Sequence, residues 1–301
     1  MILQLNIRKF VVLLFAVPGL VACTARMDIE TKDSPLVPVI YGNITGETVH
    51  QFVRISSSSP YFEQDSTHLV EDADVRVLSS EGKEYVYKYY ENGYYFSEHL
   101  FAAKAGETYK LTVRVDFNQD GTEEIYEAET TMQPAIELDS INIELIDFMG
   151  FNHFALNASW QDPQGVETYY LFKYSINDSV SNDAIDRFIT VDDHMYDGAY
   201  LDKVTVTYFE DAEDEDVIRM HERSDDDGDR QDLVKSGDKI LLQLINIEKG
   251  YYNFIRDCRR GKRGENPFFG GPPSNVYTNL TNGAVGYFTS YTWREASAVV
   301  P

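Results

Sequence analysis

Short runs of aromatic and β-branched residues, each followed by a turn signal, recur from residue 37 onward. In residues 110–117, apolar side chains at odd positions alternate with polar ones at even positions, which predicts a strand with one buried face. Seven such runs occupy the first part of the chain: 37–44, 51–55, 73–78, 84–90, 94–98, 109–117 and 125–132. Seven short strands in about 100 residues are the number found in an immunoglobulin-like β-sandwich. We therefore predict an all-β chain whose residues 35–133 form such a sandwich.

Turn residues separate these runs where hairpins are needed. Asn92-Gly93 is the clearest signal, because both residues tolerate the positive φ of a tight two-residue hairpin. Glycine also lies in the expected turns at Gly82 and Gly106.

A second β-rich domain with one short helix is expected over residues 134–301. Its strand candidates are residues 141–145, 155–160, 169–175, 188–191, 203–209 and 239–247, and residues 286–291 are expected as a final strand in the same unit. Residues 248–260 are the helix candidate, because Tyr251, Phe254 and Cys258 continue from Ile247 at helical spacing. We expect Gly261 to end this helix. Residues 210–229 hold eleven acidic residues, which predicts a solvated excursion.

The N-terminus has the pattern of a signal peptide. Arg8 and Lys9 precede an apolar stretch over residues 10–21, which is too short for the roughly 20 residues of a membrane-spanning helix. Leu20-Val21-Ala22-Cys23 has the form of a bacterial lipobox, so residues 1–22 would be removed and Cys23 acylated. Residues 23–34 would then be a polar tether, and the protein would be held at a membrane by acylated Cys23. The alternative is an ordinary secretory signal followed by an incidental cysteine.

Charge and cysteine content exclude several classes of protein. The chain has 26 Lys and Arg against 50 Asp and Glu, a formal net charge of −24. Such a surface repels phosphates, so we expect no nucleic-acid partner. Two cysteines cannot form a disulfide framework.

Several motifs together resemble the DUF4249 family of Bacteroidetes outer-membrane lipoproteins. They are Val39-Ile40-Tyr41-Gly42-Asn43-Ile44, Glu91-Asn92-Gly93-Tyr94-Tyr95, Ala105-Gly106-Glu107-Thr108-Tyr109, Asp162-Pro163, Asn266-Pro267-Phe268, Pro272-Pro273-Ser274-Asn275-Val276, Asn279-Leu280-Thr281-Asn282-Gly283 and Gly286-Tyr287-Phe288. The resemblance implies an outer-membrane lipoprotein of unknown activity, often encoded near TonB-dependent transporters, with no catalytic residues to carry over. The acidic residues 210–229 depart from the family's pattern.

Residues 116–127 match the loop pattern of an EF-hand calcium site at every specified position. Its candidate ligands are the oxygen-bearing side chains of Asp116, Asn118, Asp120, Glu124 and Glu127. The flanking residues alternate as strands, however, whereas an EF-hand needs helices. The alternative is a polar hairpin turn whose Asx side chains bond their own backbone. A weakly bound calcium ion is therefore the only cofactor candidate.

Two features of the helix candidate and its surroundings allow alternative interpretations. Cys258 lies among arginines that can activate a thiol, but it shares the apolar side of the helix, as a small buried hydrophobe would. The basic residues 256–263 could meet anionic headgroups, an acidic partner or the chain's own acidic residues 210–229. Asp192-Asp193-His194 is expected to be a turn.

No hydrolase, metalloprotease or phosphate-loop motif is present, so we predict a chain that is not an enzyme. Tyrosine pairs such as Tyr89-Tyr90, Tyr94-Tyr95 and Tyr169-Tyr170 would place one ring outward, either for recognition or as ordinary packing. Two functions remain open. One is an accessory binding lipoprotein that works with a TonB-dependent transporter in nutrient uptake, and the other is a structural or adhesive envelope protein that binds another protein.

Overall fold

The computed structural model describes residues 36–58, 68–148, 150–217, 219, 232–263 and 276–301. The expected signal peptide, Cys23 and the expected tether at residues 23–34 lie outside the described residues, as do residues 218 and 220–229 of the acidic stretch. Among the helices in the described part of the chain, none is both long and apolar enough to cross a membrane.

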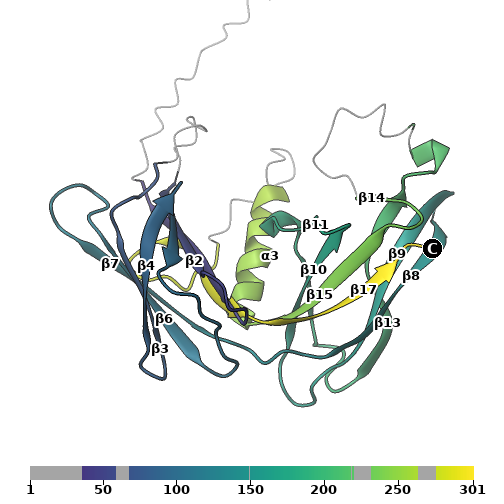
Figure 1. The fold of residues 1–301 in the computed structure, drawn as a ribbon, viewed down its shortest axis with the longest axis horizontal. Helices are drawn as coiled ribbons and strands as arrows, with labels where there is room; N and C mark the ends of the chain where they lie inside the picture. The colour runs from purple at the N-terminus through teal and green to yellow at the C-terminus, as the bar shows by residue number, and fades with distance from the viewer. Residues whose placement is uncertain (1–35, 59–67, 149, 218, 220–231, 264–275) are drawn as a thin grey trace, which may run out of the picture. The chain divides into compact units, whose positions relative to one another are not determined.

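The first seven strands form a β-sandwich, as predicted (Figure 1). They are β1 (Pro38–Thr45), β2 (Phe52–Ser57), β3 (Asp74–Ser79), β4 (Glu84–Glu91), β5 (Tyr94–Ser97), β6 (Thr108–Val115) and β7 (Glu124–Thr131). With β16 (Val285–Tyr291) they form one sheet in the order β16-β1-β2-β5-β4-β3-β6-β7. The sheet folds over its own core, because β16 at one end of this order contacts β7 at the other.

Local sequence explains these strands well. Tyr109, Leu111, Val113 and Val115 of β6 are buried in alternation, which confirms the expected inward face. At the β4–β5 turn, Asn92 and Gly93 have φ values of 52° and 76°, which confirms the tight hairpin.

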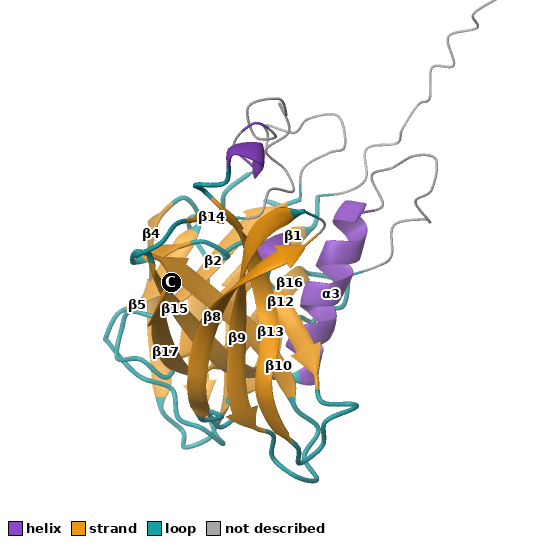
Figure 2. Cartoon of the chain, turned by 90° about the vertical axis from the view of Figure 1, so that its right-hand side faces the viewer, coloured by secondary structure: helices purple, strands orange, loops and turns teal. Residues whose placement is uncertain are grey.

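Two further sheets make up most of the remaining chain (Figure 2). One contains β8 (Leu138–Phe148), β9 (Phe151–Gln161), β13 (Tyr200–Asp211) and β14 (Leu233–Val234) in the order β14-β13-β9-β8. The other contains β10 (Tyr169–Ile176), β11 (Ser179–Val180), β12 (Ile189–Asp192), β15 (Lys239–Ile247) and β17 (Trp293–Val299). Trp160 is fully buried between them, and its ring packs edge-on against Tyr170 and Phe172. The all-β prediction is confirmed.

The acidic stretch begins inside a strand. Glu210 and Asp211 belong to β13, where Glu210 pairs with His153 of β9 and Leu233 of β14. The excursion therefore starts later than we expected from charge alone, and residues 218 and 220–229 lie outside the described part.

Helix α3 (Lys249–Arg263) follows β15 directly. Tyr251, Phe254 and Ile255 are buried, and with Cys258 they join an apolar cluster that includes residues of β10, β15 and β16. The expected apolar side is thus confirmed, but the expected end at Gly261 is wrong, because the helix continues to Arg263. A single glycine costs only about 1 kcal/mol in a helix, which the packing of the preceding turns outweighs.

The expectation that residues 286–291 pair within the second unit is also wrong. β16 pairs in parallel with β1 of the sandwich, with Tyr41 opposite Tyr287, and β17 takes the place beside β15. Gly286 permits the pairing, because a Cβ there would lie 2.1 Å from the carbonyl oxygen of Ile40. The sandwich sheet therefore takes its eighth strand from beyond residue 134.

Candidate functional site

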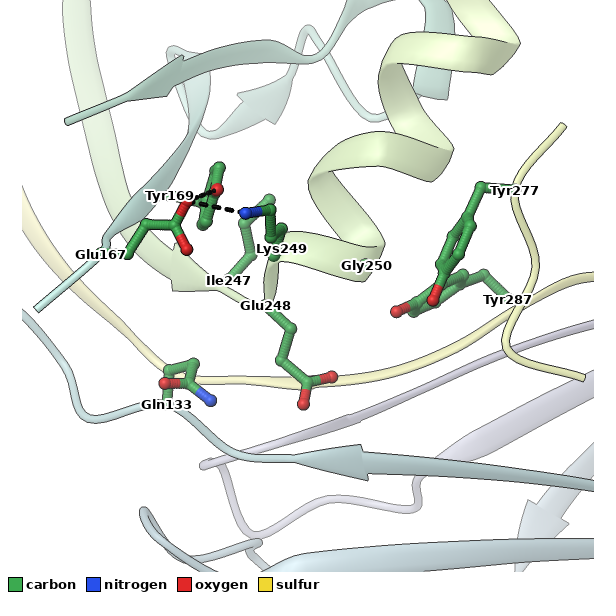
Figure 3. A pocket seen from close by; sticks show the side chains of 9 residues that line it. All are labelled: Gln133, Glu167, Tyr169, Ile247, Glu248, Lys249, Gly250, Tyr277 and Tyr287. Carbon is green, nitrogen blue, oxygen red and sulfur yellow. Dashed lines mark hydrogen bonds and ion pairs between the residues drawn. The ribbon is translucent and has the colours of Figure 1, made fainter. Parts of the chain in front are cut away.

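The first turn of α3 opens onto a cavity of about 340 Å³, which we call the α3 pocket (Figure 3). Its lining comes from the end of the sandwich, from the segment leading into β10, and from β15, α3 and β16. The lining residues are Gln133, Glu167, Tyr169, Ile247, Glu248, Lys249, Gly250, Tyr277 and Tyr287.

Glu248 is held in the pocket by β7. Its carboxylate accepts hydrogen bonds from Thr130 Oγ1 at 2.7 Å and from the Thr131 backbone N–H at 2.8 Å. Thr130 Oγ1 in turn accepts from the backbone N–H of Ser290 in β16, at 3.0 Å. A side chain that precedes α3 is thereby fixed against two strands of the sandwich.

Burial raises the pKa of Glu248, and its two hydrogen bonds offset part of that effect. Both donors are neutral, and among the described residues no Lys, Arg or His forms an ion pair with this carboxylate. The pocket therefore contains a partly buried carboxylate that no described cation pairs with.

One wall of the pocket already contains an ammonium group. Lys249 Nζ lies 2.8 Å from Glu167 Oε1 and 5.8 Å from the centre of the Tyr169 ring. Tyr169 Oη also donates a hydrogen bond to Glu167. These partners, with the hydrogen bond from Lys249 first, lower the pKa of Glu167.

The opposite wall is aromatic. The rings of Tyr277 and Tyr287 have centroids 6.2 Å apart, and Tyr287 is buried whereas Tyr277 is 46% exposed. A Cβ on Gly250 would lie 2.2 Å from Tyr287 Oη, so any larger residue there would displace this hydroxyl from the first turn of α3. Figure 3 shows the Glu248 carboxylate between this wall and Gln133.

A second cavity of about 340 Å³ shares Glu167 with the first and is lined by Gly165, Val166, Asp193, His194 and Asp197. Asp193 is buried and accepts a hydrogen bond from the Thr168 backbone N–H at 2.8 Å. Asp192 is the last residue of β12 and residues 194–198 form turns, so the turn expected at Asp192-Asp193-His194 begins later than predicted.

The calcium-loop candidate is a hairpin turn between β6 and β7. Asp116 accepts hydrogen bonds from the backbone N–H groups of Asp120 and Gly121, at 3.0 and 2.8 Å. Glu124 accepts from the Phe117 N–H and from Asn118. Backbone and amide donors thus already occupy oxygens that a metal would need.

The last calcium-ligand candidate is directed elsewhere. Glu127 lies along β7 and pairs with Lys110 at 2.9 Å. In the part of the chain that the structure describes, no three His, Cys, Asp or Glu residues are grouped so as to hold a metal ion. The geometry favours the hydrogen-bonded hairpin, and calcium binding stays a prediction to be tested.

The structure bears on both alternative interpretations of α3, that of Cys258 and that of the basic residues 256–263. Cys258 is half-buried in the apolar cluster, and burial raises its pKa to about 11, which favours the small hydrophobe over the reactive thiol. Arg256 and Arg260 each lie 3.9 Å from Asp257 on the same helix. Both of these contacts lie within α3 itself.

The tyrosine pairs follow strand alternation only where one sheet face is open. Tyr95 is buried while Tyr94 is partly exposed, and Tyr90 is 69% exposed. Tyr169 and Tyr170 are both buried, so the expectation of one outward ring is wrong there. The reason is that β10 has the sheet core on one side and the α3 cluster on the other.

The outward rings gather on one face of the sandwich, in what we call the aromatic row. It consists of Phe52, Tyr90, Tyr94 and Phe96, whose neighbouring ring centroids lie 5.7–6.3 Å apart. The guanidinium of Arg54 lies 5.2 Å from the centre of the Tyr94 ring.

Sequence reasoning missed the α3 pocket. Glu248 was expected only as the first residue of a helix, and Gln133 only as the end of a domain. Neither belongs to a motif, because the pocket forms only when β16 joins the sandwich and brings Tyr287 to α3.

Comparisons with known proteins complete this picture. Residues 24–297 match the model of a family described as "Domain of unknown function (DUF4249)". A search of curated proteins gives no match. Among solved structures, the chain is similar to a two fibronectin type-III domain segment from chicken tenascin, with 10% identity over 70% of this chain and 90% of that one, and a TM-score of 0.19.

Proposed function

We propose that this chain, which belongs to the DUF4249 family, is a non-catalytic envelope lipoprotein that binds a small ligand in the α3 pocket. Acylated Cys23 would anchor it to the outer membrane. It would serve as an accessory to a TonB-dependent transporter in nutrient uptake.

The observation that carries the binding role is the position of Glu248. Its desolvation is unfavourable for the fold, yet Thr130 and Thr131 hold the carboxylate in an open cavity between aromatic and polar walls. A few fixed polar groups in a partly apolar cavity are typical of ligand sites. The catalytic alternative has less support. No Ser, Cys, Thr or His is among the described lining residues, and Lys249 and Tyr169 are both hydrogen-bonded to Glu167, whose lowered pKa makes it a weak base.

The transporter role is tested by purification from the native envelope. Tagged acylated protein should retain an outer-membrane transporter in detergent, and loss of the protein should slow uptake of that transporter's substrate. Recovery of the protein without any transporter, together with unchanged uptake, would contradict this role.

A second function is favoured by the aromatic row. Tyr90 is exposed and the other rings of the row are partly exposed, and Tyr, Phe and Arg are enriched at protein interfaces. A structural or adhesive protein would use this face to hold another envelope protein. Replacing Tyr90 and Phe96 by Ala should then abolish retention of the partner, whereas Glu248→Gln should not affect it.

A further inference from the structure

We infer that the α3 pocket takes an organic ammonium group, which would lie between the Glu248 carboxylate and the rings of Tyr277 and Tyr287. This inference rests on the proposed function, because it names the class of ligand for the same pocket.

The pocket lining is rich in hydrogen-bond acceptors. Glu248 and Glu167 contribute carboxylates, Gln133 an amide oxygen, and Tyr277 and Tyr287 phenolic oxygens. Among the described lining residues Lys249 is the only cation, and Glu167 already pairs with it at 2.8 Å. A ligand that donates hydrogen bonds and carries positive charge fits this set better than a neutral one.

Glu248 lacks the compensation that buried carboxylates usually have. Its two hydrogen bonds come from a hydroxyl and a backbone amide, which fix its orientation but supply no full charge. A bound ammonium would neutralise the carboxylate where it stands, without any movement of β7 or α3.

The neighbouring wall shows the same recognition within the chain. Lys249 places its ammonium against a carboxylate, Glu167, and over a tyrosine ring, Tyr169. Glu248 and Tyr287 also line the pocket, and among its described lining residues neither of these two side chains has a lysine bonded to it. Cations bind favourably to such rings when a site is partly desolvated.

Two electrostatic effects act on the pocket in opposite directions. The net charge of −24 raises the local concentration of cations around the protein. The first turn of α3 presents free backbone N–H groups, which favour anions. Because the Glu248 carboxylate lies in the same pocket, it repels an anion there, and we expect a cation to bind more tightly.

The test uses three probes of one chain length on the full acylated protein in detergent at pH 7. They are n-butylammonium, 1-butanol and butyrate, and saturation-transfer NMR measures the affinity of each. We expect saturable binding of n-butylammonium in the millimolar range, with the other two probes about tenfold weaker or more, a difference of about 1.4 kcal/mol. Equal or tighter binding of 1-butanol or butyrate would overturn the ammonium assignment while leaving a ligand site, and no binding of any probe would also overturn it.

Variants assign the binding to the pocket. Glu248→Gln keeps an oxygen for Thr131 but removes the charge, and should weaken n-butylammonium binding at least about fivefold. Glu144→Gln replaces an exposed carboxylate on β8, so it is the matched control and should leave n-butylammonium affinity unchanged.

The Tyr277 variants test the aromatic wall. Tyr277→Ala should weaken binding, whereas Tyr277→Phe should retain it, because phenylalanine keeps the ring face. Unchanged affinity in Glu248→Gln would refute the inference. Membrane anchoring and transporter retention are measured separately, so failure of the ammonium assignment can be distinguished from failure of the proposed function.

Discussion

The hydroxyls of Tyr41 and Tyr251 share a hydrogen bond 3.0 Å long, which joins β1 to α3 across 210 positions of sequence. Tyr251 is fully buried, and burial raises its pKa well above the usual value. The bond gives both phenol groups a hydrogen-bond partner where the sandwich sheet meets the helix. The free-energy cost of removing it therefore reports how strongly β1 and α3 stabilise each other.

Removing either hydroxyl should destabilise the protein unequally. Tyr41→Phe leaves the fully buried Tyr251 hydroxyl without its partner, and should cost about 1–3 kcal/mol in the free energy of unfolding. Tyr251→Phe should cost less, because Tyr41 lies nearer the surface. Urea unfolding of both single variants and the double variant measures this. If the two single losses simply add in the double variant, the hydroxyls are not coupled.

Gly286→Ala should detach β16 from β1. The new Cβ would lie 2.1 Å from the Ile40 carbonyl oxygen, and φ at this position is +109°, so we expect a loss of at least about 3 kcal/mol. Gly237→Ala is the control, because φ is +89° there but no atom lies within 4 Å of the added Cβ. Similar melting temperatures for the two variants would show that positive φ, and not the close contact with β1, dominates.

The charge on Glu248 should make the protein less stable as pH rises. Because its pKa is raised on folding, the unfolded chain loses its proton first, and the stabilisation present at low pH is lost as pH rises through the folded pKa. Glu248→Gln removes this loss, so its stability relative to wild type should increase from pH 4 to pH 7. Denaturant midpoints measured across this range test the sign, and a relative stability that falls with pH would contradict it.

Cys23→Ser should release the protein from the membrane. The acyl chains on Cys23 are the proposed anchor, and no described helix is suited to crossing a bilayer. Fractionation after a high-salt wash should find wild type in the membrane pellet and the variant in the supernatant. A variant that still pellets after that wash has another means of attachment.

The β6–β7 turn should keep its stability without calcium. Since backbone N–H groups already bond Asp116, millimolar calcium should leave the melting temperature unchanged. Asp116→Ala should lower it by the same amount with and without the ion. A calcium-dependent rise that Asp116→Ala and Asp120→Ala abolish would establish the metal site instead.

The local sequence pattern predicted where the strands lie better than it predicted which strands pair with each other. The alternation in β6 and the Asn92-Gly93 turn contain all the information that a hairpin needs, and both were found where the sequence indicated. The partner of β16 could not be predicted, because Tyr287 to Tyr291 are all buried and show no alternation that would favour one sheet over the other. The choice depends on Gly286 fitting against Ile40, which is a contact between distant segments.

The pocket was missed for the same reason. Glu248 differs from the other acidic residues only through Thr130 and Thr131, which are more than 110 positions away. Likewise, Tyr169 and Tyr170 were expected to differ in exposure, and only the position of α3 over β10 explains why both are buried.

The last two strands have a consequence for biogenesis. β16 completes the sheet that begins at Pro38, and β17 completes the one built on β15, so the chain's final residues are divided between two sheets. During synthesis, neither sheet can acquire its full set of strands until the C-terminus has left the ribosome. Late closure of this kind keeps a nascent chain open for as long as it is being made, which would suit the export that the proposed lipoprotein function requires.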